Sequence, residues 1–329
     1  MLPFIFAAIL AFIIIMYVIL DGFDLGIGIL FPFTHNEKER DQMMNSVAPV
    51  WDGNETWLVF GGAVLYGAFP QVYGLILPIL YMPLMLMLIG LIFRGVSFEF
   101  RFKANKSKPL WNWIFSISSI AVSFFQGVIL GCFVQGFNVD EAAMTVNNPD
   151  WMTPFSLLTG VALVCGYGLL GATWTIIKVE DRLQKHMVHI AKGLLIMVSI
   201  FLVFISIWTP LHNTEIFYRW YSFPDILFLA PLPLITMLMV YLTWKSLDKG
   251  HEGRPFLFSI IIFLCSYAGI AISVYPYLIP HQVTIWEAAA PDSTLKFILI
   301  GVVIMLPILI GYTLYAYHVF RGKTQDGYH

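Results

Sequence analysis

Four acidic residues near the N-terminus interrupt segments that are otherwise apolar. Asp21 and Asp24 lie in the first such segment, and Asp52 and Glu55 lie at the start of the second. The members of each pair are three residues apart, which places them on one face of a helix. A charge inside a membrane span is costly, and neither segment contains a Lys or Arg. These acids therefore need a partner from another helix, water or a bound proton, which makes them candidates for a proton relay.

A structural role is the alternative for the same residues. Asp21 and Asp24 can form permanent bonds to Arg94, to Asn54 or to helix ends, and Asp52 can cap the helix that begins beside it. Arg94, at the end of the third apolar segment, can extend to water or pair with the acids. Because all four acids cluster at one depth, the sequence favours the relay. The predicted supporting polar residues are Arg94, Glu99 and Asn54.

The histidines and cysteines bear on haem and metal binding. All eight histidines lie in loops or near the ends of apolar segments, so no bis-histidine haem site is predicted. His186 and His189 are three residues apart, and we interpret them as part of a solvated helix face. The three cysteines lie inside apolar runs without a CxxC pattern, as small buried side chains do. We expect no metal ligand and no catalytic residue in this chain.

Composition defines the elements that must hold these residues in place. The chain has 329 residues, of which 59% are hydrophobic and 12% charged, and its net charge of −2 gives no reason to expect a nucleic-acid partner. A soluble domain carries about 25% charged residues, so lipid must surround most of this chain. Long apolar runs in lipid are helices, because each backbone polar group needs a partner within the segment. The predicted fold is all-α, with about nine transmembrane helices near 4–31, 50–69, 71–95, 112–136, 155–178, 187–208, 225–246, 255–279 and 295–320.

The basic residues predict the orientation of these helices. In the nine-span arrangement every Lys and Arg except Arg219 and Lys296 lies on one side. Basic loops stay in the cytoplasm, so we expect a periplasmic N-terminus and a cytoplasmic C-terminus. The start of the chain has no basic region before its apolar run and is interpreted as the first span, not as a cleaved signal. The loop from Asn138 to Pro154 contains acids but no Lys or Arg, as an outer loop can.

Three motifs resemble the hallmark stretches of subunit II of the cytochrome bd quinol oxidases. They occur in order within the first 101 residues and are Leu20–Gly28, Asn45–Trp57 and Phe93–Arg101. The stretch from Val283 to Glu287 also resembles the segment before the last helix of that family. The chain is most similar to the short, cyanide-insensitive branch.

The resemblance implies a haem-free subunit of a terminal oxidase that couples quinol oxidation to the reduction of O2 to water. Haems b and d, or b only, are expected in a partner, subunit I, and small accessory subunits, lipid and a structural quinone are further implied partners. The implied architecture is two four-helix bundles plus one peripheral helix, with a first bundle over about 1–136 and a second bundle and last helix over about 155–320. Localisation in the bacterial inner membrane follows.

The resemblance also implies roles for single residues. Asp52 matches a residue of the cytoplasmic proton path towards the haems, and Asp21 and Asp24 lie near that route. Trp57 corresponds to a residue near a hydrophobic O2 conduit. We expect Trp57 and the nearby Trp51 to line this conduit or to pack between helices.

Two other classes of protein compete with this interpretation. A proton-coupled secondary transporter also places acids in spans, although no internal repeat is recognisable, and a membrane scaffold would use them for packing alone.

Overall fold

The computed structural model describes residues 1–136, 139–140, 145–146, 151–280 and 282–324, and these residues are predominantly helical. The helices are α1 (Leu2–Leu30), the 3-10 helix η1 (Phe31–Phe33), α2 (Glu37–Asn45), α3 (Trp51–Ala68), α4 (Pro70–Ile79), α5 (Tyr81–Lys103), α6 (Lys108–Gln135), α7 (Pro154–Lys178), α8 (Asp181–His212), α9 (Thr214–Tyr221), α10 (Asp225–Leu229), α11 (Pro231–Asp248), α12 (Gly253–Val274) and α13 (Asp292–Val319). Two antiparallel pairs of short strands are β1 (Val139–Asp140) with β2 (Thr145–Val146), and β3 (Tyr277–Ile279) with β4 (Val283–Thr284).

All nine predicted segments are helical in this structure. Within the described ranges, eight stretches are long and apolar enough to cross a membrane, and the remaining segment is α3. Its 18 residues would extend about 27 Å, close to the thickness of the hydrocarbon core. Asp52, Asn54 and Glu55 lower its hydropathy. Because α3 packs along α1 and α13, we count it as the ninth pass of the chain.

Prolines break two of the predicted segments. The third segment divides into α4 and α5 at Leu80, and Pro83 follows within the first turn of α5, where it cannot donate a backbone hydrogen bond. The seventh segment divides into α10 and α11 at Ala230, directly before Pro231. The short helix α2 was not predicted, and it is capped by Asn36, which accepts a hydrogen bond from the Glu39 backbone.

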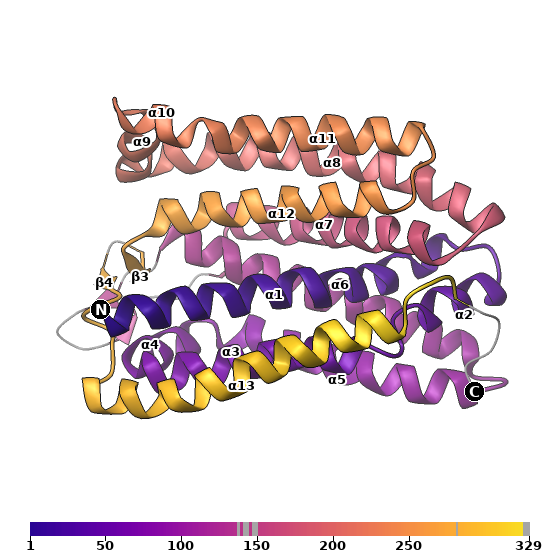
Figure 1. Cartoon of the computed structure of the whole chain (residues 1–329), viewed down its shortest axis with the longest axis horizontal. Helices are drawn as coiled ribbons and strands as arrows, with labels where there is room; N and C mark the ends of the chain where they lie inside the picture. Colours follow the sequence, from indigo (N-terminus) through magenta and orange to yellow (C-terminus); the bar gives the residue numbers. More distant parts are fainter. Residues whose placement is uncertain (137–138, 141–144, 147–150, 281, 325–329) are drawn as a thin grey trace.

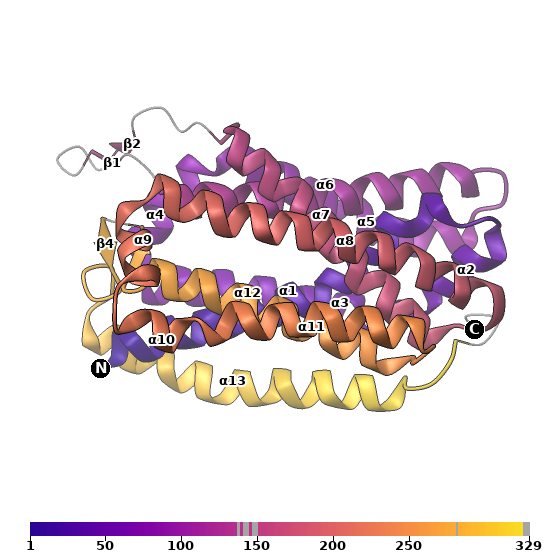
Figure 2. The same cartoon turned by 90° about the horizontal axis from the view of Figure 1, so that it is seen from above.

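The long helices lie side by side and run between two ends of the molecule (Figures 1 and 2). The N-terminus lies at the end that carries α4, α9, α10 and the β3–β4 hairpin, whereas α2 lies at the opposite end, as does the last turn of α13. We refer to the end with α2 as the basic end, because most Lys and Arg residues lie in its turns. The acidic loop predicted at 138–154 lies largely outside the described residues.

The packing divides the long helices into neighbouring groups. α1, α3, α5 and α6 form one set of contacts, α7, α8, α11 and α12 form another, and α7 joins the two through α1 and α6. The last helix, α13, packs mainly on α3 and so belongs beside the first group, not the second. One hydrophobic core extends across both groups. The proposed domain limits near 136 and 155 therefore stay a prediction.

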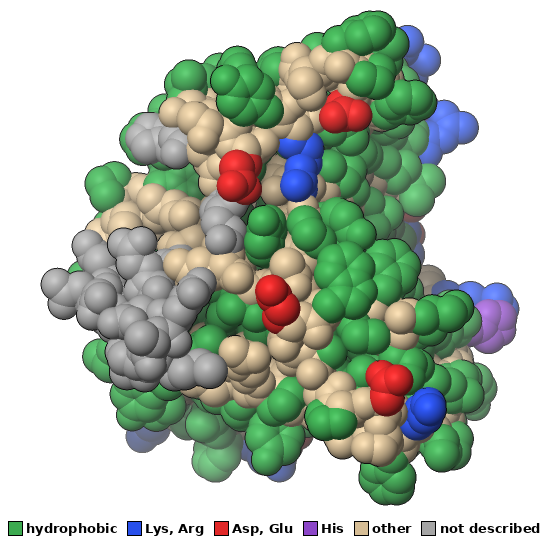
Figure 3. All heavy atoms as spheres, turned by 90° about the vertical axis from the view of Figure 1, so that its left-hand side faces the viewer, with side chains coloured by type: hydrophobic (Ala, Val, Ile, Leu, Met, Phe, Trp, Pro, Cys, Tyr) green, Lys and Arg blue, Asp and Glu red, His purple; other side chains and the backbone are tan. Residues whose placement is uncertain are grey.

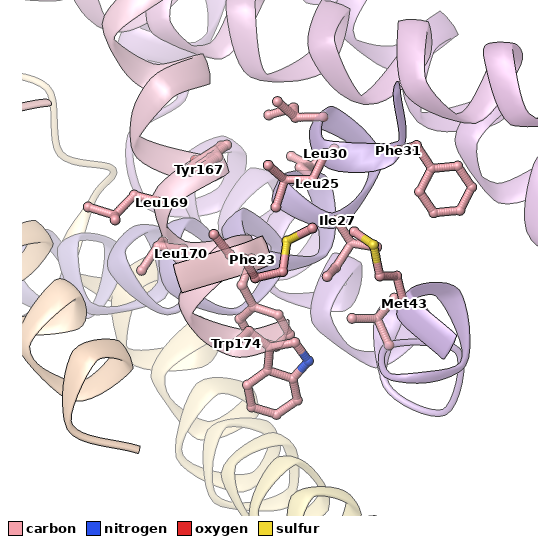
Figure 4. Packing of buried hydrophobic residues seen from close by; sticks show 14 of the residues in the cluster. Phe23, Leu25, Ile27, Leu30, Phe31, Met43, Tyr167, Leu169, Leu170 and Trp174 are labelled. Carbon is pink, nitrogen blue, oxygen red and sulfur yellow. The ribbon is translucent and has the colours of Figure 1, made fainter. Parts of the chain in front are cut away.

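A close contact between α1 and α7 depends on glycine. The spacing of Gly22 and Gly26 is typical of helices that approach each other closely. A Cβ atom added at Gly26 would lie 2.0 Å from the Tyr167 carbonyl oxygen and 2.8 Å from the Gly171 Cα atom. The backbones of α1 and α7 thus touch at a point where no side chain fits. Beside this contact, Phe23 of α1 stacks on Trp174 of α7 with ring centroids 4.4 Å apart (Figure 4).

Candidate functional site

Arg94 of α5 lies at the centre of the candidate site and is completely buried. Its Nη1 atom donates to Asp21 Oδ1 of α1 at 2.6 Å, and its Nη2 atom donates to Glu55 Oε1 of α3. Asp21 is buried as well, whereas the Glu55 side chain is 22% exposed. One cation therefore bridges acids from two other helices. Removing one member of such a buried group is costly, because a charge is left without its partner.

Asp24, almost one turn further along α1, is held by a second polar group. Asn54 Nδ2 of α3 donates to Asp24 Oδ2 at 2.7 Å, and the Tyr317 hydroxyl of α13 donates to Asn54 Oδ1 at 3.1 Å. Asn54 thereby connects α1, α3 and α13. The remaining oxygen, Asp24 Oδ1, is buried and has no hydrogen-bond partner within the described part of the chain. We refer to Asp21, Asp24, Asn54, Glu55, Arg94 and Tyr317 as the buried network.

The buried network contains more acids than cations. Among the described residues, Asp21, Asp24 and Glu55 share one cation, Arg94. Asp21 and Asp24 are both completely buried, and leaving a buried negative charge uncompensated would cost several kcal/mol. The arrangement thus favours a bound proton on at least one carboxyl group. Groups that bind and release a proton are the components of proton transfer.

Further hydrogen bonds extend from this network into the helix bundle. Tyr17, one turn before Asp21 on α1, lies beside the Asp21 carboxylate. Gln126 of α6 donates to the Tyr17 hydroxyl at 2.6 Å and accepts from the Tyr167 hydroxyl of α7 at 2.8 Å. None of these three residues was predicted. Tyr17 has a sequence signal in its spacing of four residues from Asp21, and Gln126 has one as a polar residue inside an apolar segment, whereas Tyr167 has none.

Asp52 lies at the edge of the site and not within the buried network. It is exposed in the first turn of α3, close enough to Glu55 for the two charges to interact. The cap of α3 is Val50, and no side chain donates to or accepts from the helix end there. The capping alternative for Asp52 is therefore wrong. The four predicted acids thus divide into three that share the buried network and one that faces outward beside Glu55.

The other predicted residues have different surroundings. Glu99 is exposed, and its ion-pair partner among the described residues is Lys103, at 3.4 Å, so it was predicted to support the network but lies outside it. Trp57 is completely buried, and its Nε1 atom donates to Thr313 Oγ1 at 3.4 Å. Trp51 stacks on Phe98 with ring centroids 4.8 Å apart. Both tryptophans thus pack between helices, and the O2 conduit stays a prediction.

A second ionic cluster lies at the basic end of the molecule and was not predicted. Arg101 of α5 is completely buried, and it donates to Asp41 at 2.6 Å, to Glu37 at 3.0 Å and to Asn112 at 2.5 Å. These bonds fasten the short helix α2 to α5 and α6. Each side chain in the cluster has a fixed partner, so we assign the cluster a structural role.

Two of the described histidines form a close pair. His35 and His186 lie near each other at the basic end, with ring centroids 4.8 Å apart. Direct contact between the two rings leaves no room for a haem between them. Across the described ranges, no group of three or more His, Cys, Asp or Glu residues is placed to hold a metal ion.

The fold and the buried network define a polytopic helical membrane protein with proton-binding groups between its first three long helices. The profile of the family described as cytochrome bd terminal oxidase subunit II matches residues 2–320, and the chain belongs to this family. It is 28% identical to cytochrome bd-I ubiquinol oxidase subunit 2 of Escherichia coli (strain K12), over 98% of this chain and 95% of that protein. It is 29% identical to cytochrome bd ubiquinol oxidase subunit 2 of Bacillus subtilis (strain 168), over 95% of this chain and 94% of that protein.

A solved structure supports the fold. A chain of the bd oxidase from Geobacillus thermodenitrificans has a TM-score of 0.79 at 18% identity and covers 97% of this chain and 98% of its own length. Family membership implies a haem-bearing subunit I as partner and a location in the bacterial inner membrane. The protein is thus a subunit of an oxygen-reducing respiratory enzyme, and the transporter alternative is not supported.

Proposed function

We propose that this chain is the haem-free subunit of a bd-type quinol oxidase, that it stabilises subunit I, and that it provides part of the cytoplasmic proton path for the reduction of O2. The buried network carries this proposal, because in the described part of the chain three carboxyl groups interact with one cation, Arg94. An enzyme that forms water consumes protons, and a group of acids with room for a proton is suited to deliver them.

The proposed path begins at Asp52 and proceeds through Glu55. Asp52 is exposed, Glu55 lies on the next turn of the same helix and is partly exposed, and Glu55 reaches Arg94 in the interior. Asp21 and Asp24 continue the path on α1. Exposure falls along this sequence of groups, from the exposed Asp52 through the partly exposed Glu55 to the two completely buried aspartates.

The proposed orientation places the N-terminus in the periplasm and the C-terminus in the cytoplasm. Charged side chains are sparse on the end of the molecule that carries the N-terminus, where hydrophobic side chains cover much of the surface (Figure 3). Arg219 and Lys296 are the basic residues of the elements there, whereas most of the remaining Lys and Arg lie in the turns and helix ends at the other end. The proton path then opens towards the cytoplasm, as proton uptake requires.

Several finer features stay predictions. They are the set of haems in subunit I, a quinone held by this chain, small accessory subunits and membership of the cyanide-insensitive branch. A visible spectrum of the purified complex would test the set of haems, and chromatography of its extract would test the quinone. Electrophoresis of the complex would test the accessory subunits, and inhibition by cyanide would test the branch. Haem that co-migrates with this chain after separation from subunit I would contradict the haem-free assignment.

The substitution Asp52→Asn tests the proton path. Asn nearly preserves the shape of the side chain but cannot release a proton. Proton transfer by a positioned side chain contributes about 10²–10⁴-fold, and bypass by water would reduce the effect, so we expect quinol-dependent O2 consumption to fall about tenfold or more. Haem content and assembly should stay nearly normal, and Asp52→Glu should retain more activity than Asp52→Asn.

Glu99→Gln is the matched control, since it removes an exposed acid that lies outside the buried network. It should consume O2 at the wild-type rate. A fully assembled Asp52→Asn enzyme with wild-type activity would show that Asp52 has no part in proton delivery. Failure of this variant to assemble would support a purely structural role.

A further inference from the structure

An open cavity of about 570 Å³ lies between α9, α10 and α12, and no residue of the buried network lines it. It is at the end of the molecule that carries the N-terminus (Figure 1). Its walls are mainly apolar and include Phe228, Leu229 and Ile272, while Arg219 and Asp225 are its charged residues. Cavities of about 300–1,000 Å³ are the usual size for small-molecule sites. An apolar cavity with one positive and one negative group at its lining is suited to an amphipathic ligand that carries both charges.

Arg219 is partly held by the protein and partly free to bind a ligand. Its Nη1 atom donates to the carbonyl oxygens of Ile272, at 2.7 Å, and of Ser273 and Tyr275 at the end of α12. Its Nε and Nη2 atoms have no hydrogen-bond partner in the ranges that the structure covers. The guanidinium is thus fixed in position by one nitrogen, and two parallel donors remain. This geometry matches the oxygens of a phosphate group.

Asp225 supplies the opposite charge. Its carboxylate is exposed, and its bond to another side chain is a long one of 3.4 Å from the Ser222 hydroxyl. No ion pair joins Asp225 to Arg219 among the described residues, although both line the same cavity. A ligand with a phosphate and an amine can therefore pair with both residues at once.

The surroundings of the cavity place it at the surface of a membrane. α9 and the turn after it expose the aromatic residues Phe217, Tyr218, Tyr221 and Phe223, and such residues gather at the level of lipid headgroups. Trp220 fastens α9 to α12 by donating from Nε1 to Ser273 Oγ at 2.8 Å. The charged residues of the cavity thus lie at headgroup depth, and its apolar wall continues along α12 towards the hydrocarbon core.

We propose that this cavity binds a phospholipid with an ethanolamine headgroup, from the leaflet on the side of the N-terminus. The phosphate accepts from Nε and Nη2 of Arg219, the ammonium group donates to Asp225, and the acyl chains cover the apolar wall that includes Phe228 and Ile272. A phosphatidylglycerol has no ammonium group for Asp225. A phosphatidylcholine has a cation that cannot donate a hydrogen bond, so it should bind more weakly.

Native mass spectrometry of the purified two-subunit oxidase tests this proposal. The delipidated complex is incubated with an equimolar mixture of palmitoyl-oleoyl phosphatidylethanolamine and phosphatidylglycerol, and the ratio of the two bound lipids is measured. The ethanolamine lipid should predominate in the wild type. Asp225→Asn should lower the ratio about tenfold, which corresponds to about 1.4 kcal/mol. Arg219→Gln should reduce the binding of both lipids.

Asp292→Asn is the matched control, because Asp292 is an exposed acid at the same end of the molecule but does not line the cavity. It should leave the ratio unchanged. Equal binding of the two lipids to the wild type, or an unchanged ratio in Asp225→Asn, would overturn the proposal. Soluble phosphoethanolamine should not displace the lipid, and displacement at equal concentration would show that the site recognises the free headgroup instead. Asp225→Asn decides the outcome even where Arg219→Gln does not fold, since among the described residues the side chain of Asp225 has only the long hydrogen bond from Ser222 to lose.

Discussion

Of the residues in the buried network, Arg94 should be the one whose substitution destabilises the protein most. Arg94→Gln removes the cation that contacts both Asp21 and Glu55 and leaves the carboxyl groups in the interior without it. Breaking a buried ion pair by removing one partner costs about 3–5 kcal/mol. This is a large fraction of the 5–15 kcal/mol that stabilises a typical protein. We therefore expect little assembled oxidase from this variant.

Removing one acid should be less harmful. Asp21→Asn leaves Arg94 paired with Glu55, so the cation keeps a partner. In the double variant Asp21→Asn with Arg94→Gln, the two completely buried side chains are both neutral and can still form a hydrogen bond. Residues in direct contact typically show coupling energies of about 0.5–3 kcal/mol. The double variant should therefore be more stable than Arg94→Gln alone, although it contains one substitution more.

The assay is the yield of haem-containing complex and its thermal midpoint, measured for the wild type, both single variants and the double variant in one membrane background. The expected order of stability is wild type, Asp21→Asn, the double variant and Arg94→Gln. Two results would refute this reasoning. One is an Arg94→Gln complex as stable as the wild type, and the other is a double variant that is destabilised by the sum of the two single effects.

The remaining predictions concern packing, pH and orientation. Gly26→Ala should abolish assembly, because its Cβ would overlap the Tyr167 carbonyl. Gly62→Ala should assemble normally, because no atom of the described residues outside its own helix backbone lies within 4 Å of the added Cβ. Equal yields of assembled complex from the two variants would contradict the close packing of α1 and α7. Hydrogen bonds from Lys323 and Gln184 lower the pKa of Glu252 below 4.5. The attachment of the C-terminal segment should therefore persist above pH 4.5 and weaken as the pH falls further. The pH dependence of protease cleavage after Lys323 should show this, and the same pH dependence in Glu252→Gln would exclude it. A reporter fused to the C-terminus should be active only in the cytoplasm, and activity in the periplasm would reverse the proposed orientation.

Sequence patterns predicted the helices of this protein well, because lipid imposes a simple requirement on each of them. The predicted limits of α1 and α7 agree with the structure to within two residues, since a long apolar run can only be a helix. The breaks at Leu80 and Ala230 were missed, although Pro83 and Pro231 indicate them. In both cases a single residue separates two helices within a run that is otherwise apolar.

Prediction of the site was limited by contacts between distant residues. The acids were found because each of them is costly in a span, and Arg94 was identified as a candidate partner. Tyr317 was not, because 263 residues separate it from Asn54 and a tyrosine near the end of a span has an ordinary role as an anchor. The error on Glu99 was avoidable. Five residues along a helix rotate a side chain by about 140°, so Glu99 and Arg94 cannot share a face.

The bond between Asn54 and Tyr317 has a consequence for how the protein is made. Ribosomes synthesise α1 first and α13 last, so Asp24 enters the membrane long before the helix that completes its hydrogen-bonded group exists. Until α13 inserts, Asn54 lacks one of its partners and the surface of α3 that α13 covers is open. The hydrogen-bonded group in the interior of the subunit is therefore complete only once the last helix has packed beside α1 and α3. A chain that terminates before α13 cannot complete this group.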